Sequence, residues 1–212
     1  MVRKIATQIQ SDQLVSNRRE QIINGAIKVF HRKGFHVATT TDIAKEAGLT
    51  QSNLYNYVNS KQDVLLLVCD HLVGLYNKII DGVVAQYSDP HVCIVEGLDA
   101  IIKVMVTHRH EVQLLYHETH VLEKRDRMAV LVSISGFISR FEALLDGYEI
   151  TYGKLELRNK RLAANLLTFV PAIFALRSWD LVGNGGSRSL HEGILKFILA
   201  GLGIPGSPVN TK

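Results

Sequence analysis

Uncharged polar side chains gather between Thr50 and Val58, on a stretch whose apolar residues have helical spacing. Leu54 and Val58 are four residues apart, so they share one face of a helix, which we expect to be buried. A side-chain amide offers a donor and an acceptor together, as the major-groove edge of adenine requires. The opposite face therefore has the chemistry needed to read base edges, and its members are Gln51, Ser52, Asn53 and Asn56.

Two short helices joined by a glycine turn are expected to position this face. Thr39 caps the first helix, and Asp42 three residues later completes a reciprocal capping box. Gly48 ends that helix, because the chain needs a left-handed residue there and glycine adopts this conformation without a Cβ penalty. The second helix follows at about 50–58. A preceding helix, from 17 to 33, braces the pair, which gives a three-helix helix-turn-helix arrangement.

Positive charge is concentrated in the same part of the chain. The first 66 residues contain nine lysines and arginines and five acidic residues, so they carry the whole formal charge of +4. A basic surface around a helix-turn-helix is expected of a protein that neutralises phosphates. The alternative is an ordinary solvated basic surface.

The cysteines and the apolar runs indicate a soluble, cytoplasmic protein. Cys69 and Cys93 lie in apolar runs with neither metal-type spacing nor a disulfide framework, which favours a reducing compartment. No signal peptide opens the sequence, and no uninterrupted apolar run approaches the ~20 residues that cross a bilayer. We therefore expect no membrane partner.

The remaining sequence also has helical spacing and no sustained period-two alternation. Helices are expected at about 61–87, 91–107, 109–121, 124–150, 155–182 and 188–202. The predicted fold class is all-α, with an N-terminal helix-turn-helix domain and a C-terminal helical bundle for ligand binding and dimerisation. The predicted boundaries are a flexible arm at 1–16, the DNA-binding domain at 17–63, the bundle at 64–204 and a flexible tail at 205–212.

Three motifs follow one another between Arg18 and Leu66: AIKVFHRKGFHVATTTDIAKEAG, LTQSNLYNYV and NSKQDVL. In this order and spacing they closely resemble the tetracycline-repressor-like (TetR) family of bacterial transcriptional regulators. The resemblance implies that some residues contact phosphates and leave the amide face to read bases. The implied phosphate contacts are Thr40, Tyr55, Tyr57 and Lys61, and the full expected DNA-binding set is Thr39, Thr40, Gln51, Ser52, Asn53, Tyr55, Asn56, Tyr57 and Lys61.

Structural alternatives apply to several of these residues. Helix packing is the alternative for Tyr55 and Tyr57, and a solvated surface lysine is the alternative for Lys61. The family often has an aromatic residue at the position of Val58, and an aromatic residue or histidine at that of Asn56, so the individual base contacts are not transferred.

The resemblance also implies a homodimer on double-stranded operator DNA, because such repressors place two heads on successive turns of the groove, ~34 Å apart or a multiple of it. The last two helices carry broad apolar stripes, which would form a four-helix bundle across a two-fold axis. The alternative is that these stripes belong to the monomer's own core. The expected interface residues are Leu162, Leu166, Phe169, Ile173, Leu190, Ile194, Phe197 and Ile198.

A small-molecule effector is implied for the C-terminal bundle. The segments LLYHETHVL, FEALLDG and ALRSWDL are similar to a subset of these regulators linked to fatty acid or acyl-CoA metabolism, so the expected effector is a long-chain acyl group, free or as a thioester. Arg140 and Arg177 would hold an anionic head group, with ordinary ion pairs as the alternative. Isolated polar groups among apolar ones give the expected ligand-binding set: Tyr116, His117, His120, Phe137, Arg140, Phe141, Phe174, Arg177 and Trp179.

Catalytic signatures are not recognisable in the sequence. The run HETH at 117–120 spaces its histidines three apart, whereas the zinc hydrolase pattern spaces them four apart. With no P-loop, nucleophile elbow or dinucleotide fingerprint, we expect no enzyme, metal or cofactor. The leading hypothesis is a ligand-responsive dimeric repressor, with activation left open. The alternatives are a sensor acting through a protein partner and a helical metalloenzyme built on the His108 to His120 cluster.

Overall fold

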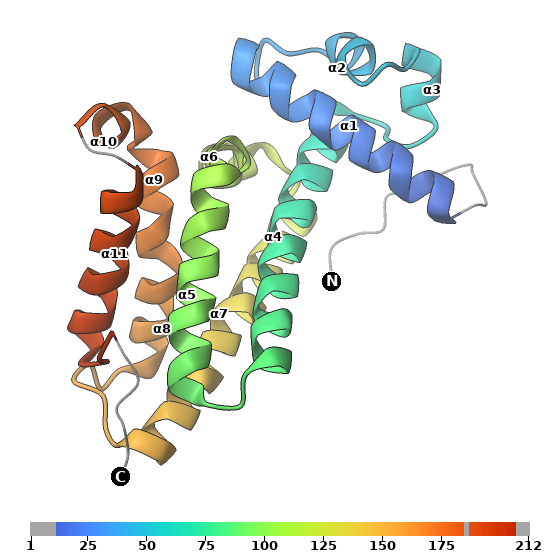
Figure 1. Ribbon diagram of the computed structural model, residues 1–212. Helices are drawn as coiled ribbons and strands as arrows, with labels where there is room; N and C mark the ends of the chain where they lie inside the picture. The colour runs from blue at the N-terminus through green and yellow to red at the C-terminus, as the bar shows by residue number, and fades with distance from the viewer. Residues whose placement is uncertain (1–11, 185–186, 207–212) are drawn as a thin grey trace. The chain divides into compact units, whose positions relative to one another are not determined.

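The computed structural model describes residues 12–184 and 187–206, and these residues form helices and no strand (Figure 1). The prediction of an all-α fold is confirmed. The helices are α1 (Asp12–Lys33), α2 (Thr40–Glu46), α3 (Gln51–Tyr55), α4 (Lys61–Gln86), α5 (Pro90–Thr107), α6 (Arg109–Glu118), η1 (Thr119–Val121), α7 (Lys124–Tyr152), α8 (Lys160–Phe169), η2 (Val170–Ala172), α9 (Ile173–Leu176), α10 (Ser178–Asn184) and α11 (Ser187–Leu202).

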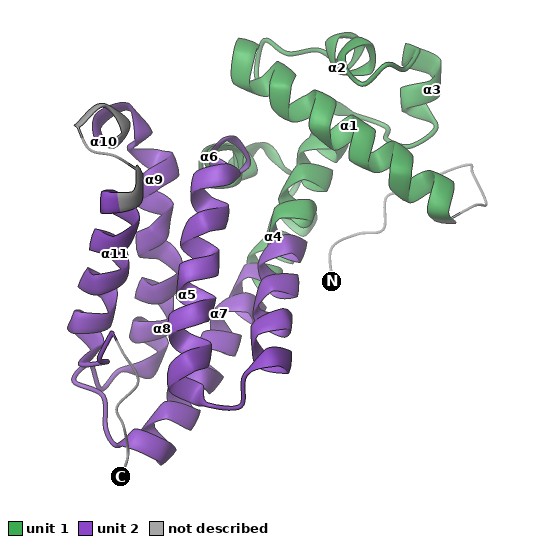
Figure 2. Ribbon diagram, viewed as in Figure 1, with its two compact units in different colours: residues 1–72, 113–133 green, residues 73–112, 134–212 purple. Residues whose placement is uncertain are grey.

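The chain divides into two compact units (Figure 2). Unit 1 comprises Met1–Leu72 and Gln113–Ser133, and unit 2 comprises Val73–Val112 and Ile134–Lys212. The predicted boundary after residue 63 is therefore wrong, because the first part of α4 and residues 113–133 cluster with the N-terminal helices. One contact that joins them within unit 1 runs from His36 Nε2 to Glu118 Oε2, 3.6 Å apart.

Helix α1 buries one apolar face and ends at a glycine. Ile22, Ala26 and Val29 are fully buried, which is why the spacing of apolar residues identified this helix correctly. Gly34 then adopts φ 76°, and its N–H donates to the carbonyl of Phe30 at 2.8 Å. The helix begins at Asp12, so residues 12–16 are helical and the predicted flexible arm is too long. The other residues of that arm, 1–11, lie outside the described part of the chain.

The two short helices of unit 1 start where the sequence predicts, but α3 ends at Tyr55, so its predicted extension to residue 58 is wrong. Thr39 and Asp42 form the reciprocal capping box of α2. Gly48 has φ 68°, and the next N–H, that of Leu49, closes the helix by donating to the carbonyl of Ala44 at 2.8 Å. Thr50 caps α3 by accepting a hydrogen bond from the Asn53 N–H at 3.1 Å. Local hydrogen bonds thus fix both ends of the turn between α2 and α3.

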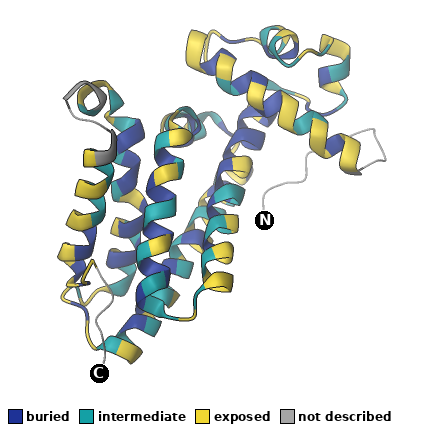
Figure 3. Ribbon diagram, viewed as in Figure 1, coloured by how far each residue is buried: buried dark blue, intermediate teal, exposed yellow. Residues whose placement is uncertain are grey.

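Unit 2 is organised around α5, which contacts α8, η2, α9 and α11. Its longer helices, such as α5 and α8, have buried and exposed residues that alternate along the helix (Figure 3). The aromatic rings of Tyr76, Phe137 and Phe141 form part of the core, with centroid distances of 5.1 Å for the first pair and 5.6 Å for the second. This part of the core is made of closely packed aromatic side chains.

The predicted single helix at 155–182 is wrong. Asn159 caps α8, so helical structure starts only at Lys160. Pro171 lies in η2 and has no N–H to donate, which interrupts the helical ladder after Phe169. Farther on, the carbonyl of Pro205 accepts a hydrogen bond from His91 Nε2 at 2.7 Å, so this residue of the predicted tail is anchored in unit 2. Residues 207–212 of that tail lie outside the described part.

Helix α7 is long and apolar enough to cross a membrane, by length and composition alone. A mostly buried core helix of a soluble protein passes the same test, whereas 22% of the apolar window of α7 is buried. A single helix of this kind is weak evidence. A cytoplasmic location stays a prediction.

Candidate nucleic-acid interface

The amide face predicted to read bases lies on α3 and at its C-cap. Leu54 is fully buried beneath it, while Gln51 and Ser52 are exposed and Asn53 and Asn56 are partly exposed. The face is therefore presented to solvent by a helix whose apolar side is fixed in the core of unit 1. Its amide and hydroxyl groups match the hydrogen-bonding pattern of base edges.

A hydrogen bond between hydroxyl groups joins α2 to α3. Thr40 Oγ1 and Tyr55 Oη are 3.0 Å apart, and the Tyr55 side chain is 43% exposed. Hydrogen bonds from Thr40 and then from Gln51 lower the pKa of the Tyr55 phenol, because both stabilise its charged form. Two of the predicted phosphate contacts are thus side by side at the edge of the amide face. We call Thr40, Gln51, Ser52, Asn53, Tyr55 and Asn56 the reading surface.

Tyr57 does not belong to that surface. It follows the end of α3, where the chain turns inward, and it is only 2% exposed. Its side chain therefore packs in the core of unit 1, and the predicted phosphate contact is wrong for this residue. Tyr57 lies three positions after the buried Leu54, so helical spacing places both on one face, whereas Tyr55 directly follows Leu54 and lies on another face.

Lys61, the first residue of α4, has its ammonium group among backbone carbonyls. Its Nζ donates to the carbonyls of Phe35, His36 and Ala38 at 2.7, 2.9 and 2.9 Å. It also lies 4.7 Å from the centroid of the Phe35 ring. Neither the implied phosphate contact nor the alternative of a solvated surface lysine accounts for this arrangement.

Other charged groups of unit 1 form ion pairs between α1 and α2. Lys28 and Arg32 lie 3.9 and 3.2 Å from the carboxylate of Glu46. Lys33 contacts Asp42 at 2.7 Å, and this hydrogen bond, followed by those from Thr39, lowers the pKa of Asp42 from 3.8 to about 2. The Thr39 hydroxyl accepts from the Asp42 N–H and donates to the Asp42 carboxylate, so it serves as the cap of α2.

Comparison with known proteins identifies the family. Residues 22–68, which include α2, α3 and the start of α4, match the bacterial regulatory proteins of the tetR family. Residues 22–68 therefore form an N-terminal domain of the tetR family. The HTH-type transcriptional regulator HbdR of Aromatoleum sp. (strain CIB) is 27% identical to it over 122 residues, which are 58% of this chain and 53% of HbdR. The chain thus spans about half the length of this curated relative.

Solved structures share the fold of the whole chain. A tetR-family regulatory protein from Rhodococcus RHA1 is similar with a TM-score of 0.75 and 15% identity, over 92% of this chain and 100% of that one. FadR of Bacillus subtilis, crystallised with stearoyl-CoA, is similar with a TM-score of 0.71 and 16% identity, over 86% and 98% of the two chains. At these identities the similarity concerns the fold.

The predicted ligand-binding residues are divided between the two units. Tyr116, His117 and His120 belong to unit 1, and the other six belong to unit 2. Phe137, Phe141 and Phe174 are buried. The three remaining residues lie as follows: Arg140 pairs with Asp81 and donates to the carbonyl of Asn77 at 3.2 Å, Arg177 is exposed, and Trp179 is 81% exposed.

Arg140 is therefore engaged in the ion pair that we gave as its alternative. Trp179 is too exposed to line an enclosed cavity. The predicted set does not form a ligand site as a whole.

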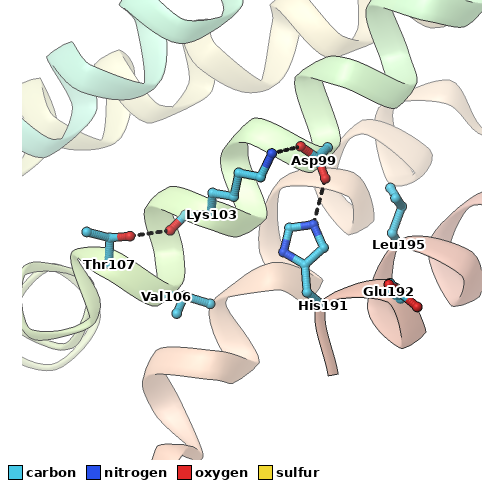
Figure 4. Close-up of a pocket in the computed structure, with 7 residues that line it drawn as sticks. All are labelled: Asp99, Lys103, Val106, Thr107, His191, Glu192 and Leu195. Carbon is cyan, nitrogen blue, oxygen red and sulfur yellow. Dashed lines mark hydrogen bonds and ion pairs between the residues drawn. The ribbon is translucent and has the colours of Figure 1, made fainter. Parts of the chain in front are cut away.

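A groove of about 400 Å³ lies on unit 2 between α5 and α11 (Figure 4). Lys103 from α5 and His191 from α11 both point at the carboxylate of Asp99, and His191 Nε2 lies 2.7 Å from it. Burial raises the pKa of Asp99, but the hydrogen bonds from Lys103 and His191 outweigh this and hold it below its ordinary value. These groups satisfy one another, and no predicted ligand residue lines the groove.

The predicted dimer residues separate into exposed and buried groups. Ile198 is 5% exposed and belongs to the core, whereas Ile173, Leu190 and Ile194 are partly exposed. The other four are exposed by between 39% and 71% although they are large and apolar, and they lie on α8 and α11, which contact each other. We call these four the apolar face: Leu162, Leu166, Phe169 and Phe197.

Two histidines of the predicted cluster, His108 and His120, have structural contacts. His120 Nδ1 donates to the carbonyl of His117 at 2.7 Å, and His108 Nδ1 lies 2.8 Å from Glu111 Oε1. Among residues 12–184 and 187–206, three or more His, Cys, Asp or Glu side chains nowhere gather closely enough to hold a metal. The histidine cluster thus gives no support to the metalloenzyme alternative.

Proposed function

We propose that the chain is a DNA-binding transcriptional regulator that reads its operator with the reading surface of unit 1. The observation that carries this proposal is the exposed amide face of α3, held against α2 by the hydrogen bond between Thr40 and Tyr55. A preorganised, uncharged hydrogen-bonding face suits the major groove. The match of residues 22–68 to the tetR family supports the same function.

We further propose that the regulator is a homodimer joined through the apolar face. One reading surface covers only a few base pairs, so affinity for an operator requires two. Leu162 and Leu166 follow one another on α8 at a helical spacing of four, and Phe197 lies on the neighbouring α11. Side chains of this size exposed together are typical of a protein interface.

The proposed effector is a long-chain acyl group, free or as a thioester, that releases the regulator from DNA. Support comes from the shared fold with FadR of Bacillus subtilis, which binds stearoyl-CoA. An effector that binds the DNA-incompetent form more tightly lowers operator affinity by linkage, and a difference of ~1 to 3 kcal/mol is sufficient for regulation. Release by the effector makes the protein a repressor.

Two experiments test these proposals. In vitro selection from a random duplex pool should yield a site with two-fold symmetry. In mobility-shift titration the protein should bind this site tightly at low salt, and its affinity should fall as the salt concentration rises. If purified protein enriches no sequence, the proposed function is wrong. Stearoyl-CoA titrated into the complex should release the DNA, and mass spectrometry of small molecules that copurify with the protein should find an acyl compound. If neither occurs, the effector is of another class.

A further inference from the structure

Lys61 uses its whole hydrogen-bonding capacity within unit 1. An ammonium group has three N–H donors, and here three carbonyls, those of Phe35, His36 and Ala38, lie 2.7 to 2.9 Å from Nζ. The ring of Phe35 covers the same group at 4.7 Å. A direct hydrogen bond to a DNA phosphate would require one of these contacts to be given up.

The three carbonyls belong to the loop that joins α1 to α2. Phe35 and Ala38 are 4% and 2% exposed, so the loop is anchored in the core at both positions. Its carbonyls need a donor, because a partly buried carbonyl without one costs free energy. No residue of the loop itself serves all three, and Lys61 reaches them from 23 to 26 positions away in sequence.

The position of this loop determines where α2 begins. Ala38, whose carbonyl Lys61 binds, is followed directly by the cap residue Thr39 and then by Thr40. Thr40 in turn contacts Tyr55 on α3 at 3.0 Å. A continuous series of hydrogen bonds and two peptide units therefore connects Lys61 to the reading surface.

We propose that Lys61 is a positioning residue for operator recognition and that it does not itself contact phosphate. It fixes the loop at residues 35–38, which places Thr40 and Tyr55 and thereby orients the amide face of α3. The proposal rests on the proposed function of this surface in binding DNA. A phosphate contact would instead make Lys61 a general source of affinity for any sequence.

Lysine acetylation of the wild-type protein tests the contact directly. A brief treatment with the N-hydroxysuccinimide ester of acetic acid, followed by peptide mass spectrometry, gives the reactivity of Lys61 relative to Lys45, which is exposed on α2. We expect Lys61 to react at least about tenfold more slowly in the free protein, and its rate to stay the same when a selected duplex is added. A Lys61 that reacts as fast as Lys45 and becomes protected only by DNA would overturn the proposal.

Variants of the same lysine distinguish positioning from charge. Lys61→Arg keeps the charge, but the planar guanidinium cannot direct three donors at one point among the carbonyls. We expect it to lose about tenfold or more in affinity for the selected duplex, with little loss on a random duplex and an unchanged dependence on salt. Lys61→Met should also lose affinity mainly for the selected duplex. Lys45→Met, which removes an exposed lysine of α2, is the matched control.

A phosphate contact by Lys61 would give the opposite binding results in these variants. If Lys61 contacts phosphate, Lys61→Arg will bind like the wild type, while Lys61→Met will weaken both duplexes alike and reduce the slope of log K against log salt by ~0.9. Circular dichroism establishes whether the variants fold, and the acetylation result stands without them. A wild-type protein that binds no duplex would count against the proposed function, whereas the reactivity of Lys61 in free protein would still test its burial among the carbonyls.

Discussion

Hydrogen bonds position the functional groups of unit 1, whereas apolar packing dominates unit 2. In unit 1, Thr39, Thr40, Tyr55 and Lys61 each have a specific polar partner. In unit 2, the central aromatic rings contact one another, and apolar side chains such as Phe197 remain exposed. Hydrogen bonds impose distances and angles, while apolar contacts tolerate many side chains of similar volume. Unit 1 is therefore suited to read a fixed object such as DNA.

The same difference explains where similarity to other proteins is found. The family match covers residues 22–68, which lie in unit 1. A capping box or a glycine with positive φ leaves few acceptable residues at its position, so its pattern persists in sequence. An apolar bundle keeps its fold while its residues change, because many side chains of similar volume pack equally well.

The largest expected effect concerns the apolar face of unit 2. Leu166→Glu places a charge in the proposed interface, so we expect a monomer and a loss of at least about 100-fold in affinity for the selected duplex, since the two heads no longer act together. Sedimentation velocity and mobility-shift titration measure the two effects. Ile150→Glu, at an 87% exposed apolar residue of α7, is the control and should stay dimeric. A dimeric Leu166→Glu variant would place the interface elsewhere.

The next effect concerns specificity in unit 1. Gln51→Ala removes an exposed amide from the reading surface, so we expect a loss of ~1 to 3 kcal/mol on the selected duplex and a relaxed preference at the base pair concerned. Asn56→Ala should act in the same way at another base pair. Competition against single-base variants of the site provides the measurement. Gln13→Ala, which also removes an exposed amide but from α1, should leave base preference intact.

A pair of glycine substitutions compares the packing of the two units. A Cβ at Gly25 in α1 would lie 2.9 Å from the backbone nitrogen of Ala47, so Gly25→Ala should lower the free energy of unfolding by ~1 to 3 kcal/mol. A Cβ at Gly74 in α4 meets open space, so Gly74→Ala should raise it by ~0.5 to 1 kcal/mol. Urea unfolding followed by circular dichroism measures both. If Gly25→Ala is neutral, α1 and α2 are packed less closely than described.

The parts of the fold that depend on near neighbours were predictable from the sequence. The capping box joins positions three apart, and Gly48 acts within its own turn, so both were identified correctly. Lys61 was misassigned because its partners lie 23 to 26 residues away, a distance over which spacing carries no information. Tyr57 was misassigned because the family resemblance implied a phosphate contact, although its spacing of three from the buried Leu54 places both on one helix face.

The ligand site was the least predictable part. Phe137 and Phe141 have the same spacing whether they line a cavity or fill a core, and the structure places them in the core. In the groove between α5 and α11, Asp99 contacts His191, which is 92 positions away in sequence. Spacing along one helix could suggest only the pair of Asp99 and Lys103, four positions apart. A site made by distant segments depends on the packing of whole helices, which the periodicity of apolar residues does not determine.

The smallest expected effect tests the polar construction of unit 1 through pH. The pKa of Asp42 is about 2 in the folded chain, compared with 3.8 for an unperturbed carboxyl, because Lys33 and Thr39 bind its charged form. A lowered pKa stabilises the folded state above pH 3.8, and this contribution is lost as the pH falls toward 2. We therefore expect the thermal midpoints of the wild type and of Asp42→Asn to converge between pH 4 and 2. In Lys33→Met the Asp42 pKa, followed by NMR, should move back toward 3.8, and a wild-type value already near 3.8 would show that unit 1 depends less on these contacts than the structure indicates.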